Sequence, residues 1–128
     1  MQTILVIEDN KDIRENTCEL LELEGYRVFA ADNGKTGLDM VKGIRPNIIF
    51  CDVLMPGGDG YEVLLGLNAD AELSVIPLIF ISASVEKKNI EEGLHLGATG
   101  FLKKPFTSEE LLESIANCHR QPKSKVYY

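Results

Sequence analysis

Several residue types are scarce in this chain of 128 residues, which has no tryptophan and only three cysteines, Cys18, Cys51 and Cys118. An odd number cannot all pair within the chain, and the spacings match no metal-binding motif, so we interpret the three as reduced packing residues. No stretch approaches the ~20 apolar residues of a membrane-spanning helix, and the first residues lack the basic segment of a secretory signal. We therefore expect a cytoplasmic protein with no membrane contact.

Positive charge is also in short supply. Lysine and arginine together number 13 against 20 for aspartate and glutamate, which gives a net charge of −7. An acidic surface repels phosphate backbones, so we expect no direct binding to nucleic acid. The length and the 45% hydrophobic content are those of one ordinary globular domain that folds without disulfides or structural metal. We assign that domain to residues 1–120 and interpret residues 121–128 as a tail or the start of a linker.

Five apolar runs of strand length alternate with segments of helical periodicity. The predicted strands cover residues 3–7, 26–31, 47–51, 77–81 and 100–102. Glycines at 25, 43 and 97 end three of the helical segments, and Thr107 with Glu110 has the spacing of a capping box at the start of the last. This alternation predicts an α/β fold with a doubly wound parallel sheet of five strands and helices on both faces, of the flavodoxin-like kind. The order 2-1-3-4-5 would place the first and third strands side by side at the switch point.

Polar side chains follow four of these strands at the point where each strand ends. They are Glu8, Asp9, Asp52, Ser82, Lys103 and Lys104. Each alone is compatible with a turn, a helix cap or a solvated surface group. Together at one sheet edge, three carboxylates would repel one another unless a cation joined them, and Mg²⁺ suits oxygen ligands of this kind. With a lysine and a hydroxyl nearby, the edge is suited to receive a phosphoryl group.

The residues at these positions resemble the receiver domain of two-component response regulators. The matching motifs are Glu8-Asp9, Asp52-x-x-Met55-Pro56-x-x-Asp59-Gly60, Ser82-Ala83 and Lys104-Pro105-Phe106. The resemblance covers about residues 3 to 119, and its elements occur in the right order. The strand order given above is partly taken from this resemblance.

The resemblance implies a role for each site residue. Asp52 would be the phosphoacceptor. Asp9, Asp52 and the backbone carbonyl of Leu54 would bind Mg²⁺, with Mn²⁺ as an alternative, and Glu8 would act through water. Ser82 would hold a phosphoryl oxygen. Lys104, directly before Pro105, matches the family's lysine better than Lys103 does, and the bond between Lys104 and Pro105 would be cis. Ser82 and Phe101 would form the switch.

The resemblance also implies partners. The phosphoryl group would come from a sensor histidine kinase or a histidine phosphotransfer protein. Phosphorylation would change the face made by residues 86–96, 100–102 and 107–119, which an output domain, an effector protein or a second copy would read. The chain would be a monomer or a phosphorylation-dependent dimer. It would be a signalling domain that catalyses only its own phosphorylation and dephosphorylation.

Three other functions are weighed against this one. An aspartate-nucleophile phosphatase of the haloacid dehalogenase type carries a second aspartate two residues after the first, where this chain has Leu54. A flavodoxin-like cofactor binder needs a phosphate-binding first loop, but the loop here is acidic at Glu8 and Asp9. A degenerate receiver that acts only as a protein-docking module would be expected to lack site residues, and none is missing.

Overall fold

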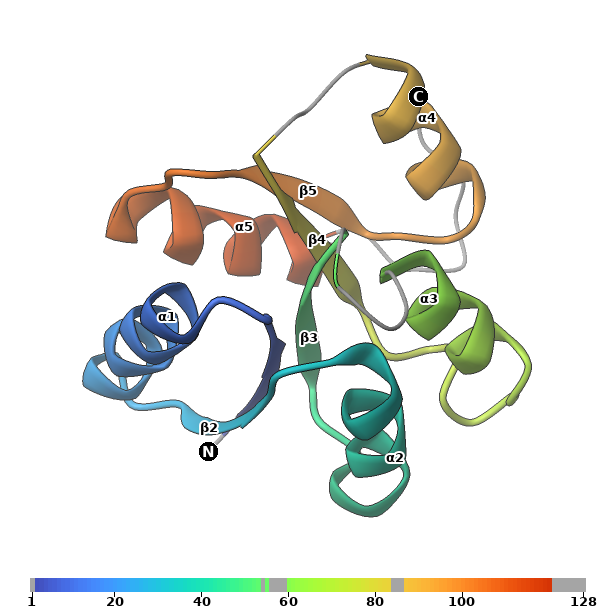
Figure 1. The fold of residues 1–128 in the computed structure, drawn as a ribbon, viewed down its shortest axis with the longest axis horizontal. Coiled ribbons are helices and arrows are strands. Elements are labelled where there is room, and N and C mark those ends of the chain that lie inside the picture. The colour runs from blue at the N-terminus through green and yellow to red at the C-terminus, as the bar shows by residue number, and fades with distance from the viewer. Residues whose placement is uncertain (1, 54, 56–59, 84–86, 121–128) are drawn as a thin grey trace.

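A computed structural model describes residues 2–53, 55, 60–83 and 87–120 (Figure 1). The strands are β1 (Thr3–Ile7), β2 (Arg27–Ala31), β3 (Ile48–Asp52), β4 (Leu78–Ser82) and β5 (Gly100–Lys103). The helices are α1 (Lys11–Leu23), α2 (Gly34–Ile44), α3 (Gly60–Asn68), α4 (Lys87–His95) and α5 (Ser108–Arg120). Strands and helices alternate along the chain, as the sequence predicts.

The five strands form one parallel sheet in the order β2-β1-β3-β4-β5, which confirms the predicted topology. In the register, Ile7 of β1 lies beside Cys51 of β3, and Ser82 of β4 lies beside Lys103 of β5. The carboxyl ends of β1, β3, β4 and β5 therefore meet at one edge of the sheet. The residues that follow these strands are brought together there, at the switch point between β1 and β3.

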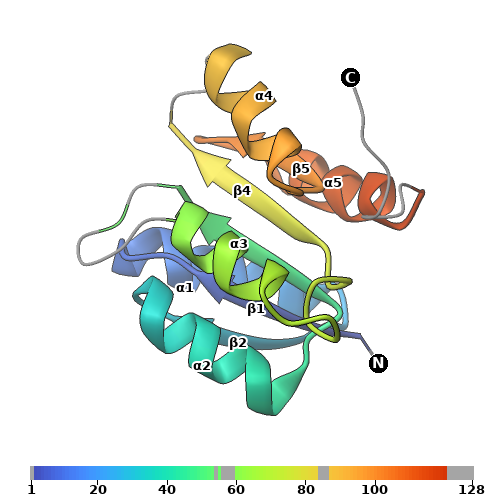
Figure 2. The same ribbon diagram turned by 90° about the vertical axis from the view of Figure 1, so that its right-hand side faces the viewer.

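Helices cover both faces of the sheet, with α1 and α5 on one side and α2, α3 and α4 on the other (Figures 1 and 2). Alternate residues of each central strand point into two separate cores. On β3, for example, Ile49 packs toward α2 and α3, whereas Phe50 packs toward α1 and α5. β3 and β4 are buried along their whole length, while the edge strand β2 is partly exposed. The apolar runs of the sequence follow from this burial on two faces.

Local side-chain bonds set the helix starts. The Asn10 side chain accepts a hydrogen bond from the amide of Ile13 at 3.0 Å and caps α1. The predicted capping box forms before α5, where the Thr107 hydroxyl and the Glu110 carboxylate each accept from the other's amide, at 3.1 and 3.0 Å. Several boundaries differ slightly from the prediction. α2 continues past Gly43 to Ile44 and is capped by Arg45, whose φ is 51°. β3 and β4 each include the polar residue that follows the predicted strand, Asp52 and Ser82.

Some predicted features lie outside the described residues. They include the carbonyl of Leu54, the loop at 56–59 and the tail at 121–128. Within the described part of the chain, none of the three cysteines forms a disulfide, as expected. No helix in that part is both long and apolar enough to cross a bilayer.

Candidate functional site

Glu8 and Asp9 occupy the turn between β1 and α1, and the start of the helix fixes them. The Asn10 amide donates to Glu8 Oε2 at 3.2 Å, while the Arg14 guanidinium donates to the Glu8 carbonyl at 2.9 Å. Glu8 is fully buried, and Asp9 beside it is exposed. The chain thus directs one carboxylate inward and leaves its neighbour open to solvent. The contact from Arg14 is not evident from the sequence, because a helix surface arginine has no distinguishing signal.

Asp52 is the last residue of β3 and is 6% exposed. The start of α3 packs directly on its backbone at Gly60, where a Cβ would lie 2.5 Å from the Asp52 carbonyl oxygen and 2.8 Å from Phe80 Cε1. The Gly60 amide donates to the carbonyl of Val53 at 2.7 Å. A glycine is therefore required here by close approach, and it lets the start of α3 lie against the carboxyl end of β3.

Lys104 joins the two buried carboxylates. Its ammonium lies 2.7 Å from Glu8 Oε1 and 3.1 Å from Asp52 Oδ2. The Lys104–Pro105 bond is cis, as expected from the resemblance, and the Lys104 amide donates to the carbonyl of Ser82 at 2.9 Å. Lys103, by contrast, is exposed on the edge strand. The structure therefore places Lys104, and not Lys103, among the carboxylates.

The charges at this edge shift the pKa values of its groups. Burial and the neighbouring Glu8 carboxyl raise the pKa of Asp52 to about 7, against the opposing effect of Lys104. Burial alone would lower the pKa of the Lys104 ammonium, but Glu8 and Asp52 hold it above its ordinary value. Burial also tends to raise the pKa of Asp9, yet its hydrogen bonds with the carboxyl groups of Glu8 and Asp52 leave it lowered. One ammonium is thus too little positive charge for three carboxylates.

These three carboxylates have the geometry of a cation site. Glu8, Asp9 and Asp52 each offer an oxygen, and the three atoms lie within 4.8 Å of one another. Hard oxygen ligands and excess negative charge fit Mg²⁺, which keeps several waters and needs few protein ligands. Burial first, and the Glu8 carboxyl second, raise the pKa of Asp52, which is consistent with a need for a cation here. The donor set therefore fits a hard divalent ion.

Ser82 and Phe101 lie on the side of the site away from β1. Ser82 ends β4 and is 8% exposed, and Phe101 on β5 is half-buried. The Phe101 ring packs against the Phe80 ring with centroids 5.4 Å apart. It also lies against α4 at Gly93, where a Cβ would lie 2.5 Å from Phe101 Cζ. The sequence identifies Phe101 but not Gly93, because the contact depends on how α4 docks.

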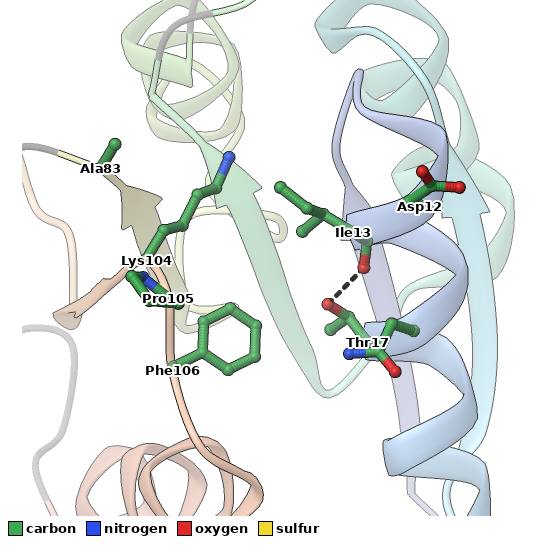
Figure 3. Close-up of a pocket in the computed structure, with 8 residues that line it drawn as sticks. Asp12, Ile13, Thr17, Ala83, Lys104, Pro105 and Phe106 are labelled. Carbon is green, nitrogen blue, oxygen red and sulfur yellow. Dashed lines mark hydrogen bonds between the residues drawn. The ribbon is translucent and has the colours of Figure 1, made fainter.

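A pocket of about 630 Å³ opens beside the carboxylate site, between α1 and the turn that connects β5 to α5 (Figure 3). Its walls include Ile13 and Thr17 of α1, Ala83 after β4, and Lys104, Pro105 and Phe106. The Lys104 side chain thus borders the pocket with its stem and reaches the carboxylates with its ammonium. No sequence pattern indicates this pocket, because its walls come from three distant segments.

Comparison with known proteins agrees with this geometry. Residues 4–116 match the family described as the response regulator receiver domain. The chain is 31% identical to protein PilH of Pseudomonas aeruginosa over 115 residues, which cover 90% of this chain and 95% of PilH. It is 36% identical to the phosphate regulon transcriptional regulatory protein PhoB of the same species, covering 89% of this chain but only 50% of PhoB. The solved structure of the chemotaxis protein CheY4 of Vibrio cholerae superposes with a TM-score of 0.88 at 29% identity, covering 92% of this chain and 98% of that one.

Proposed function

This chain belongs to the response regulator receiver domain family, and we propose that Asp52 accepts a phosphoryl group from a histidine kinase or a histidine phosphotransfer protein. The supporting observation is the position of Asp52. Its carboxylate ends the central strand, faces Lys104 at 3.1 Å and shares a cation-binding cluster with Glu8 and Asp9. In this proposal the chain is a signalling switch whose chemistry is limited to its own phosphorylation and dephosphorylation.

Asp52, Lys104 and Ser82 have different roles in the proposed transfer. An Asp52 carboxylate oxygen attacks phosphorus, and the bond from phosphorus to the donor breaks with its electron pair leaving on the donor. The Lys104 ammonium, already directed at Asp52, contacts the transferred phosphoryl group as its charge moves. The Ser82 hydroxyl donates a hydrogen bond to another phosphoryl oxygen.

Metal binding is the second part of the proposal. Asp9 and Asp52 would hold Mg²⁺ directly together with the carbonyl of Leu54, and Glu8 would act through a water; Mn²⁺ is an alternative ion. The ion would supply positive charge that offsets the three carboxylates and the incoming phosphoryl oxygens. In the structure the ammonium of Lys104 contacts both Glu8 and Asp52.

The third part concerns output. Once Ser82 turns toward the phosphoryl group, space opens beside β5, and the Phe101 ring moves further inward to fill it. The Phe101 ring lies against α4 at Gly93. Its movement therefore changes the position of α4 and the shape of the face formed by α4, β5 and α5. A partner that binds this face better in one state shifts the balance by its differential affinity. Output domains, effectors and a second copy of the chain are the partner classes that we propose.

The proposal is tested by treating the protein with acetyl phosphate and Mg²⁺ and measuring its intact mass. The parent should gain one phosphate, and Asp52→Asn should gain none, because the amide is not a nucleophile. Asp39→Asn is the matched control, since Asp39 is exposed on α2 away from the site. An equal adduct on Asp52→Asn would refute the assignment of Asp52.

A further inference from the structure

The pocket beside the carboxylates has an apolar interior and a polar rim. Ile13 and Phe106 lie on opposite walls, with Pro105 between Phe106 and Lys104 (Figure 3). The Thr17 hydroxyl donates to the carbonyl of Ile13 at 2.7 Å, so its hydrogen is already used. A volume of about 630 Å³ lies in the range of sites that bind small molecules.

Two residues make the pocket continuous with the phosphoryl site. The stem of Lys104 borders the pocket while its ammonium lies 3.1 Å from Asp52 Oδ2. Ala83, which also borders the pocket, directly follows Ser82. A molecule whose phosphoryl group contacts both Asp52 and Lys104 would therefore have its remaining atoms within reach of the pocket.

The geometry of phosphoryl transfer gives these remaining atoms a direction. The attacking oxygen and the leaving oxygen lie on opposite sides of phosphorus, roughly in line. Asp52 is 6% exposed and forms the inner side of the site, so the leaving group lies on the outer side. The rim of the pocket carries the Asp12 carboxylate, which disfavours a second negative charge at the far end of the leaving group. An uncharged apolar group fits both the interior and the rim.

We propose that this pocket binds the acyl leaving group of small acyl phosphates and makes the chain prefer donors whose acyl group is aromatic or large and apolar. This inference rests on the proposed role of Asp52. In the reaction, an Asp52 carboxylate oxygen forms the bond to phosphorus, and the bond from phosphorus to the acyl oxygen breaks. Its electron pair leaves on the carboxylate of the donor, so that charge balances and no proton is transferred. Ile13 and Phe106 are the specificity-determining residues.

The test compares benzoyl phosphate with acetyl phosphate as donors to the full chain with Mg²⁺, with phosphorylation followed by intact mass. Each rate is divided by the rate of the same donor with hydroxylamine, which removes the intrinsic difference in reactivity. We expect the parent to prefer benzoyl phosphate by about tenfold or more, the scale of discrimination in apolar pockets. Ile13→Ala and Phe106→Ala should each lower this preference severalfold. Leu20→Ala is the matched control, because Leu20 is a partly buried residue of α1 outside the pocket.

The preference is a ratio measured within one variant, so a partial loss of folded protein cancels. A ratio near one in the parent, with acetyl phosphate still modifying Asp52, would overturn the pocket assignment and leave the proposed function intact. An unchanged ratio in both Ile13→Ala and Phe106→Ala would overturn it as well. Absence of any adduct with either donor would refute the proposed function and this inference together.

Discussion

Replacing Asp52 with asparagine should make the stability of the metal-free protein independent of pH near neutrality. In the parent, burial and the Glu8 carboxyl raise the pKa of Asp52 from 3.8 to about 7. The folded state therefore holds the proton more tightly than the unfolded state. This stabilising contribution is fully present below pH 3.8 and is lost as the pH rises through about 7.

The size of the effect follows from these two pKa values. Between about pH 5 and about pH 8, proton linkage removes about 2 to 3 kcal/mol from the free energy of unfolding of the parent. For a chain of this size, that is a fall in melting temperature of roughly 10 °C. Other shifted groups act outside this window. The lowered pKa of Asp9 acts at more acidic pH, and the raised pKa values of Cys18, to about 11, and Lys104 act at more alkaline pH.

The assay is urea unfolding with a chelator present, at both pH values, for the parent, Asp52→Asn and the control Asp39→Asn. The parent and the control should lose the same stability at the higher pH, while the free energy of unfolding of Asp52→Asn should be nearly the same at both pH values. If Asp52→Asn shows the full loss, the titrating group is a different one, and the reasoning about Asp52 is wrong.

Three further predictions address the rest of the site. Mg²⁺ at about 100 times its Kd should stabilise the parent by about 2.7 kcal/mol in thermal melts, and Asp9→Ala should abolish that response. A parent whose melting temperature does not change with Mg²⁺ would contradict the cation site. Ser82→Ala should accept phosphate more slowly and lose the NMR shift changes at Phe101 that beryllofluoride causes in the parent, and unchanged shifts would disprove this coupling. Gly93→Val should cost about 1 to 3 kcal/mol of stability in denaturant unfolding, because the new side chain collides with the Phe101 ring. Unchanged stability would show that the Phe101 ring moves aside at no cost.

Much of the fold follows from local sequence signals. The strands are apolar runs because β3 and β4 are buried on both faces, and the Thr107 capping box acts within four residues. The end of α2 was less predictable. Arg45 ends that helix in a left-handed conformation, just before Pro46, and a proline disfavours helical geometry in the residue before it. Glycine at 43 was the stronger signal in the sequence but not the actual end.

The site was predictable only as far as topology determines it. Parallel strands bring Glu8, Asp52 and Lys104 to one edge of the sheet regardless of the conformations of their side chains. Which atoms pair depends on side-chain conformation, so the ion pair from Lys104 to both carboxylates required the structure. The contact between Gly93 and Phe101 and the pocket at Ile13 depend on how whole helices dock, and no short sequence pattern records that.

The central claim is that Asp52 carries the phosphoryl group, and the most direct test is to locate the modification chemically. The protein is phosphorylated with acetyl phosphate and Mg²⁺, then reduced with borohydride, which converts an aspartyl phosphate to homoserine, and its peptides are sequenced by mass spectrometry. We predict homoserine at position 52 and unmodified aspartate at position 9. Homoserine at any other position, with aspartate intact at 52, would contradict the account.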